Sequence, residues 1–468
     1  MAAVIEHKSI DYVSASERHG QVLGQVPFWF LGNFHFFTIA IGFVGPALGL
    51  SFGYTALAGT LGILFGTLFV AFHASQGAEL GVPQMIQSRA QFGFRGVVVV
   101  LVGTLFTFVG FNIANGVLIG SGLHRILGWN AAAVTIVTAA LGALLAIYGH
   151  DWLHRVFRGC FVLCLPLYTA LSVAIAVHAV APTQLHAGAF TASGFFAQFA
   201  ASASYNITYA PSVSDYSRYL PRDTRPRSII AAVYLGAAAS AIWLIILGAW
   251  LATRLGEDDG LVALYHAGNA LRAGFGALIA LASVTALTAT IGLNAYSGML
   301  TLVTGLSSLF ELRPTPRQRV LCIVGLAIVW TAVALALSVN SIALLFAVLT
   351  IMLYLLVPWT SINLIDYFGV RRGHYAITQL FVPHGLYGDW GGRGLAAYLL
   401  GVAAELPFFV VPDLYVGPAA RALGGVDLGW LVGLIVSGVT YLTLSRRFDP
   451  AREAAAIGAS ERLLAQPR

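Results

Sequence analysis

The stretch VPFWFLGNFHFFTIAIGFVGPALGL, residues 26–50, is apolar enough to cross a lipid bilayer but is a poor continuous helix. Polar or helix-breaking residues interrupt both of its halves: Gly32, Asn33, His35, Gly42, Gly45, Pro46 and Gly49. A helix in lipid satisfies its own backbone groups, so a break is tolerated only where it faces protein or a water-filled cavity. The interruption in this first span therefore predicts a site.

A second apolar stretch, FFAQFAASASYNITYAPSVSDYSRYLP at residues 195–221, has a similar interruption five spans later. Its polar and helix-breaking residues fall close together: Tyr205, Asn206, Thr208, Tyr209 and Pro211. Two irregular spans five apart predict an inverted five-helix repeat with a substrate site between its halves. The alternative for the glycines is close helix packing, which is common in membranes.

The composition places these stretches in a polytopic membrane protein. Of the 468 residues, 58% are hydrophobic and only 9% are charged, whereas soluble domains carry about 25% charged residues. Apolar runs of about 20 residues, the length that crosses the hydrocarbon core, predict an all-α protein with twelve transmembrane helices. The predicted spans are 27–50, 54–74, 97–123, 131–149, 157–181, 195–217, 229–252, 273–303, 320–338, 341–362, 394–411 and 428–444.

The basic residues follow the membrane topology rather than a nucleic-acid surface. The net charge is +6, but the arginines lie between apolar runs and form no basic face, so no nucleic-acid partner is expected. All Lys and Arg except Arg125, Arg254, Arg272 and Arg421 fall in the tails or in loops on one side. The positive-inside rule then predicts that the tails 1–26 and 445–468 are both cytoplasmic, in a multi-pass protein of the plasma or inner membrane.

Few ionisable side chains lie within the spans, and these indicate the kind of solute. They are His35, Glu405 and Asp215. A pathway without a buried Lys or Arg disfavours an organic anion, and the absence of an acidic ring disfavours a cation channel. A neutral, polar, planar solute fits better. The spans contain neither H-E-x-x-H nor a Ser/His/Asp grouping, so we do not expect an enzyme. A passive channel would differ from a transporter by equilibrating its solute without accumulation.

Two polar stretches carry a resemblance to a known family. GVPQMIQSRAQFGFRG at 81–96 and NITYAPSVSDYSRYLP at 206–221 resemble stretches of the nucleobase:cation symporters, permeases for cytosine, purines, uracil, allantoin and hydantoins. The resemblance implies a LeuT-type fold, with five-helix repeats at 27–181 and 195–362 and two extra helices within 394–444. It also implies import of a nucleobase or related heterocycle, by alternating access, with Na⁺ or H⁺ as coupling ion and no prosthetic cofactor.

The resemblance also implies a substrate pocket. Family members stack the planar substrate on an aromatic residue of span 3, commonly Trp, and Phe111 takes this place here. Asn115, one helical turn on, offers an amide to the edge of a base. Span 6 contributes Tyr205 and Asn206, with Thr208 and Tyr209 nearby, and span 8 contributes Asn294. For Tyr205 a structural hydrogen bond is the alternative role.

For the coupling ion, the resemblance points to backbone carbonyls of span 1 and hydroxyls of span 8. These correspond to Gly32 and His35, and to Thr285 and Thr288, as a Na⁺ site. Sodium-dependent relatives tend to carry two adjacent oxygen-bearing residues in span 8, but Ala289 follows Thr288 here. Proton coupling through His35 is therefore an alternative, since imidazole titrates near neutral pH, as is a merely packed His35. An amino-acid/cation symporter of the same fold is the other alternative.

Overall fold

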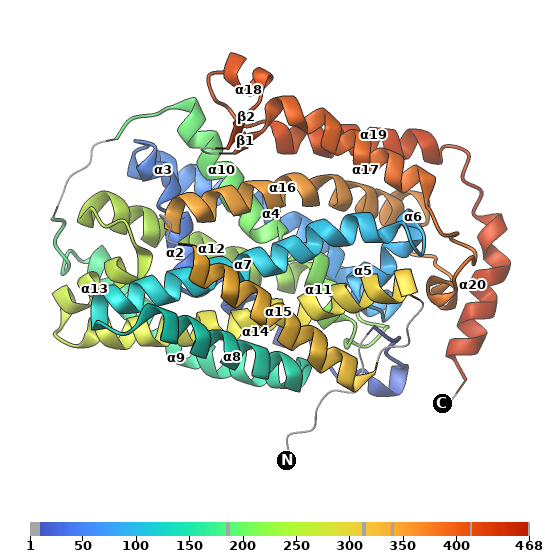
Figure 1. Ribbon diagram of the computed structural model, residues 1–468, viewed down its shortest axis with the longest axis horizontal. Coiled ribbons are helices and arrows are strands. Elements are labelled where there is room, and N and C mark those ends of the chain that lie inside the picture. The colour runs from blue at the N-terminus through green and yellow to red at the C-terminus, as the bar shows by residue number, and fades with distance from the viewer. Residues whose placement is uncertain (1–9, 184–187, 311–314, 338–340, 412–413, 467–468) are drawn as a thin grey trace.

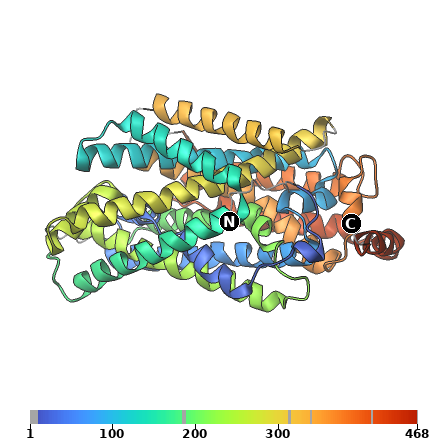
Figure 2. The ribbon, with the colours of Figure 1, turned by 90° about the horizontal axis from the view of Figure 1, so that it is seen from below.

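The computed structural model is a bundle of long helices, and it describes residues 10–183, 188–310, 315–337, 341–411 and 414–466. Most of the long helices run roughly along one common direction, as the two side views show (Figures 1 and 2). The short helices α5 and α6 and the last helix α20 lie at one end of the bundle, and α3 and α13 lie at the other (Figure 1).

The first half of the described chain is helical apart from its connecting segments and one isolated β-bridge between Leu50 and Ala189. After a 3-10 turn, η1 (Ala15–Glu17), its helices are α1 (Val22–Gly32), α2 (Phe36–Ile41), α3 (Val44–Ala47), α4 (Phe52–Leu80), α5 (Gln84–Gln87), α6 (Arg89–Phe92), α7 (Val97–Leu127), α8 (Ala131–Tyr148), α9 (His150–Ala176), α10 (Ala192–Ile207) and α11 (Ala210–Ser217).

The second half adds one small strand pair. Its elements are α12 (Pro226–Leu255), α13 (Gly260–Leu271), α14 (Phe275–Phe310), α15 (Pro316–Ala336), α16 (Ser341–Leu364), the π-helical turn η2 (Ile365–Val370), the 3-10 turn η3 (Ile377–Phe381), α17 (Gly392–Glu405), the 3-10 turn η4 (Leu406–Phe408), β1 (Val410–Val411), β2 (Tyr415–Val416), α18 (Pro418–Ala422), α19 (Gly429–Ser445) and α20 (Ala451–Leu464). β1 and β2 pair antiparallel, with Val410 opposite Val416.

Each of the twelve predicted spans contains a helix, and the described part of the chain is that of a multi-pass membrane protein. Eight helices are long and apolar enough to cross a bilayer, and a ninth crossing results if the bent pair α1–α3 counts as one. α10, α17 and α19 are shorter, so the total of twelve crossings stays a prediction. The predicted span 394–411 is wrong at its end: the helix stops at Glu405, because Pro407 cannot continue it.

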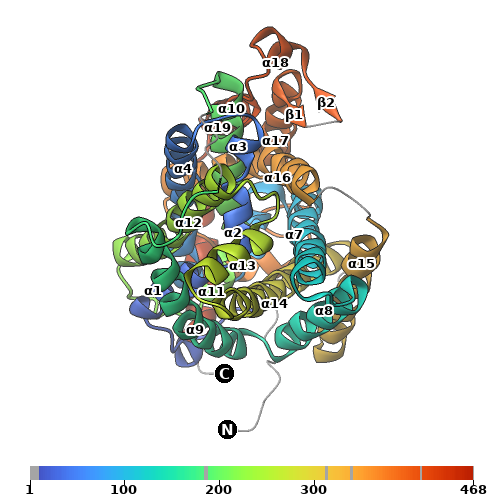
Figure 3. The same cartoon turned by 90° about the vertical axis from the view of Figure 1, so that its left-hand side faces the viewer.

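Both predicted interruptions are present. The first span bends by 58° between Gly32 and Phe36, where His35 has an extended backbone (φ −153°, ψ 168°). The span from 195 to 217 is interrupted at Thr208 and Tyr209. In the view along the bundle, α2 lies in its middle (Figure 3), where it contacts α10, α12, α13 and α14.

Small residues let helices approach closely around this broken segment. A Cβ atom on Gly66 of α4 would overlap the backbone carbonyl of Ala203 in α10. Likewise, a Cβ atom on Gly42, next to α2, would overlap the carbonyl of Ile245 in α12. In lipid, such close contacts replace the hydrophobic effect as a source of helix association. Gly42 therefore has the packing role that the sequence left open for the glycines of the first span.

The two polar stretches 81–96 and 206–221 lie against each other. The backbone N–H of Gln84 donates to the Asp215 carboxylate at 3.1 Å, and the Ser214 hydroxyl donates to the Gln84 side chain. Arg89 is buried and donates to the hydroxyls of Ser307 and Ser308 at 2.8 Å each. The stretches thus connect α11 and the end of α14 through buried polar contacts.

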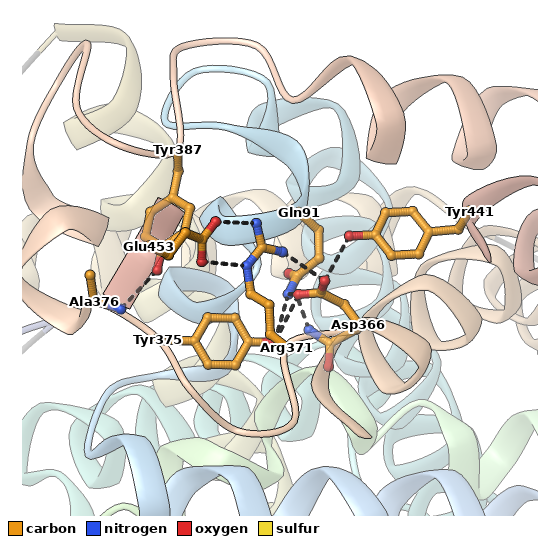
Figure 4. A network of polar contacts seen from close by, with 9 residues as sticks. Gln91, Asp366, Arg371, Tyr375, Ala376, Tyr387, Tyr441 and Glu453 are labelled. Carbon is orange, nitrogen blue, oxygen red and sulfur yellow. Dashed lines mark hydrogen bonds and ion pairs between the residues drawn. The ribbon is translucent and has the colours of Figure 1, made fainter. Parts of the chain in front are cut away.

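A second buried network fixes the last helix to the bundle (Figure 4). Asp366 in η2 is fully buried and accepts four hydrogen bonds, from Arg371 (2.6 Å), Gln91 (2.6 Å), Tyr375 (2.8 Å) and Tyr441 (2.8 Å). Arg371 also forms a two-point contact with Glu453 of α20, at 3.0 Å for each nitrogen. Burial lowers the pKa of Arg371, but Asp366 and Glu453 outweigh it and raise that pKa well above its ordinary value. The guanidinium therefore stays charged.

Candidate functional site

A small cavity lies where the interrupted spans face α7 and α14. Its lining comes from the first span, from α7, from the broken span 195–217 and from α14: His35, Phe37, Phe111, Asn115, Tyr205, Thr208, Tyr209, Thr290 and Asn294. None of these side chains is a carboxylate, a lysine or an arginine. The free space is about 10 Å³, room for about one water molecule. A planar base would therefore need these side chains to move apart.

Three aromatic rings form one wall of the cavity. The rings of Phe37 and Tyr205 stack with centroids 5.7 Å apart and planes inclined by 20°. Phe111 meets Phe37 at 5.5 Å and Tyr205 at 6.3 Å, both at steep angles. Offset and edge-to-face contacts at these distances are the favourable ones for aromatic pairs. The wall can hold a planar ring in the same manner, either on a face or against an edge.

Hydrogen bonds fix the polar groups beside this wall. The hydroxyls of Tyr205 and Thr38 share a hydrogen bond at 2.7 Å. The Gly32 carbonyl, the last of α1, accepts from the Tyr209 hydroxyl at 2.6 Å and from the His35 ring Nε2 at 3.0 Å. A carbonyl freed by the helix break thus orients two cavity side chains. The helix break therefore orients side chains of the cavity.

Four of the five predicted substrate residues meet at the cavity: Phe111, Asn115, Tyr205 and Asn294. Asn206 does not reach it. Its amide nitrogen donates to Thr67, and its oxygen accepts from Asn33 at 2.9 Å, so it joins α10 to α4 and to the end of α1. Asn294 also donates to the Asn112 side chain at 3.1 Å.

Of the predicted ion residues, Gly32 and His35 lie together, because the His35 ring donates to the Gly32 carbonyl, and the site as a whole stays a prediction. The Gly32 carbonyl already accepts two donors, and His35 presents its side chain to the cavity. Thr285 lies on an exposed face of α14, and the hydroxyls of Thr285 and Thr288 both donate to carbonyls of their own helix. The α14 hydroxyl that meets the first span is Ser283, which accepts from the Phe36 backbone N–H at 2.8 Å.

Sequence reasoning missed two lining residues, Phe37 and Thr290. Phe37 lies within a run of apolar residues after the break, and nothing in that run separates it from packing residues. Thr290 precedes Asn294 by four residues, so both share a helix face. That spacing is the signal that could have added Thr290 once Asn294 was chosen.

Comparison with known proteins identifies the family of the chain. Residues 12–433 match the model of the family described as permeases for cytosine/purines, uracil, thiamine and allantoin. The chain belongs to this permease family. A putative purine-cytosine permease of Bacillus subtilis, YxlA, is 32% identical over 94% of this chain and 96% of its own length. The purine-cytosine permease FCY2 of Saccharomyces cerevisiae is 27% identical over 56% of this chain and 50% of its own.

Solved structures show the same fold. Mhp1, a nucleobase-cation-symport-1 family transporter, in a closed conformation with bromovinylhydantoin bound, superposes with a TM-score of 0.74 at 17% identity, covering 97% of this chain and 98% of Mhp1. A Na⁺-coupled sialic acid symporter superposes with a TM-score of 0.64 at 12% identity, covering 95% and 93%. As a member of the permease family, the chain is a transporter of nucleobase-like molecules rather than an enzyme.

Proposed function

We propose that the chain imports a nucleobase or a closely related heterocycle by cation symport. The observation that carries this proposal is the cavity at the two helix breaks. Its aromatic wall of Phe37, Phe111 and Tyr205 suits a flat ring, and the amides of Asn115 and Asn294 suit the donors and acceptors on its edge. A lining without acid, lysine or arginine suits a neutral solute.

An amino-acid symporter is less well supported by the same cavity. A zwitterionic substrate needs groups that compensate its carboxylate and its ammonium, because buried charges are costly unless they are paired. The lining has no charged partner for either group. Most amino acids also have no planar ring that could pack against the aromatic wall. The uncharged base is the better ligand.

The cation supplies the driving force in this proposal, with Na⁺ or H⁺ as the coupling ion. An inward-moving cation gains about 2.3 kcal/mol per 100 mV of membrane potential, which supports about fifty-fold accumulation. Na⁺ at the Gly32 and His35 carbonyls would have to compete with the Tyr209 and His35 donors on Gly32. Thr285 and Thr288 donate their hydroxyl hydrogens to their own helix, which leaves oxygen lone pairs for a cation, so both Na⁺ and H⁺ stay open as the coupling ion in this proposal.

The transport cycle in this proposal is alternating access between two inverted repeats, 27–181 and 195–362, with 394–444 as two extra helices. The broken spans move relative to α7 and α14, and this opens the small cavity to one side of the membrane at a time. Both tails would lie in the cytoplasm, in a plasma or inner membrane.

Thermal stability of the purified protein tests binding. We expect one or more of cytosine, uracil, adenine, hypoxanthine, allantoin and benzylhydantoin to raise the apparent melting temperature, because a ligand of the folded state stabilises it by mass action. Each compound is measured in NaCl and in choline chloride at equal ionic strength. A shift only in NaCl supports Na⁺ coupling, and a shift in both supports H⁺. No shift with any compound would contradict the proposal.

A further inference from the structure

His35 is the last residue of the helix break before α2, and its side chain lines the cavity. One of its two ring nitrogens forms a hydrogen bond. Nε2 lies 3.0 Å from the Gly32 carbonyl oxygen. A carbonyl oxygen only accepts, so Nε2 carries the hydrogen. In a neutral imidazole the other nitrogen, Nδ1, then has a free lone pair and is an acceptor. The Gly32 carbonyl thereby fixes both the tautomer and the orientation of the ring.

The Nδ1 acceptor has no hydrogen-bond partner among the described residues, although it is buried. The whole residue is 1% exposed, so bulk water does not satisfy this atom. A buried acceptor without a partner carries a substantial desolvation penalty. A buried acceptor of this kind needs a donor, which a ligand or a bound water in the cavity can supply.

A second acceptor at the same cavity has the same property. The Asn115 side chain is 2% exposed, and its Oδ1 is buried without a partner. Asn115 lies on α7, one turn beyond Phe111 of the aromatic wall, whereas His35 lies on the first span. Two unsatisfied acceptors from different helices therefore line one cavity beside three aromatic rings.

We infer that His35 is a specificity-determining residue whose Nδ1 accepts an N–H group of the substrate, with Asn115 Oδ1 accepting a second one. The ligand class is a planar nitrogen heterocycle with at least two N–H donors, from the ring or from an exocyclic amine. This inference rests on the proposed function. The inference concerns the His35 side chain, whereas the predicted Na⁺ site uses its backbone carbonyl.

Ligand pairs that differ by one donor test the inference. Cytosine is compared with 1-methylcytosine and pyrimidin-2-one, and adenine with 9-methyladenine and purine, by equilibrium binding to the purified wild type, H35F, H35Q and N115L. We expect at least one donor deletion to weaken wild-type binding tenfold or more. In H35F, which has no acceptor at position 35, the same donor deletion should weaken binding less than threefold. In N115L it should weaken binding as much as in the wild type.

Each outcome has a distinct meaning. If neither cytosine nor adenine binds the wild type in any salt, the inference fails, because both bases offer two N–H donors; if none of the six compounds binds, the proposed function fails as well. If a base binds but every donor deletion leaves wild-type affinity unchanged, the role of His35 is overturned without any variant. The role of His35 is also overturned if a donor deletion reduces affinity equally in the wild type and in H35F. H35Q, which keeps a side-chain acceptor, should bind more tightly than H35F if both elute as folded protein in gel filtration.

Discussion

Phe111→Ala is expected to reduce substrate affinity at least about 30-fold, equivalent to about 2 kcal/mol. Phe111 contacts both Phe37 and Tyr205 at the cavity, so its removal takes away one of the three rings that hold a planar ligand. Uptake should fall in parallel. The affinity is measured by equilibrium binding of a base that stabilises the wild type.

Phe106→Ala is the matched control on the same helix. Phe106 is 36% exposed on α7 and does not line the cavity, so the same truncation there should leave affinity unchanged. Both variants should elute from gel filtration like the wild type. Unchanged affinity of Phe111→Ala, or an equal loss in both variants, would show that the cavity is not the binding site.

Asp366→Ala is expected to destabilise the protein by about 3–5 kcal/mol, because it removes one partner of a buried ion pair. Arg371 would remain buried beside Glu453 alone, and three further donors, Gln91, Tyr375 and Tyr441, would lose their acceptor. The change should appear as a lower melting temperature in detergent and as easier proteolysis of α20, which Arg371 holds through Glu453.

Glu461→Ala provides the comparison for a surface ion pair on the same C-terminal helix. Glu461 lies 3.7 Å from Arg222, and both side chains are more than half exposed. Exposed pairs of this kind contribute little to stability, so this variant should melt like the wild type. A melting temperature of Asp366→Ala equal to that of Glu461→Ala would contradict the structural role of the network.

The breaks in the first and sixth predicted spans could be predicted from the sequence because lipid tolerates an interrupted helix only where the break faces protein or a water-filled cavity. Gly32 and His35 in one, and Thr208 and Tyr209 in the other, lie where the helices end and begin. Helix ends were less accurate. Apolar residues continue past Glu405, but α17 ends there and the 3-10 turn η4 follows, which contains Pro407 with its missing backbone N–H.

Phe111 and Asn115 were predicted through the resemblance to the permease family, and both line the cavity from one face of α7. Asn206 shows the limit: whether its amide meets a ligand or a neighbouring helix depends on the partners Asn33 and Thr67, which are far away in sequence. The rotation of α14, which turns Thr285 outward, likewise depends on tertiary packing.

Accumulation of a bound base in proteoliposomes tests the central claim most directly. Vesicles containing the purified protein are given an inward Na⁺ gradient or an inward H⁺ gradient, and uptake of the radiolabelled base is followed over time. The proposed symport predicts accumulation above the external concentration with one of the two gradients, and loss of the accumulated base when an ionophore dissipates that gradient. Uptake that only reaches the external concentration, whichever gradient is applied, would contradict symport and indicate a passive pathway.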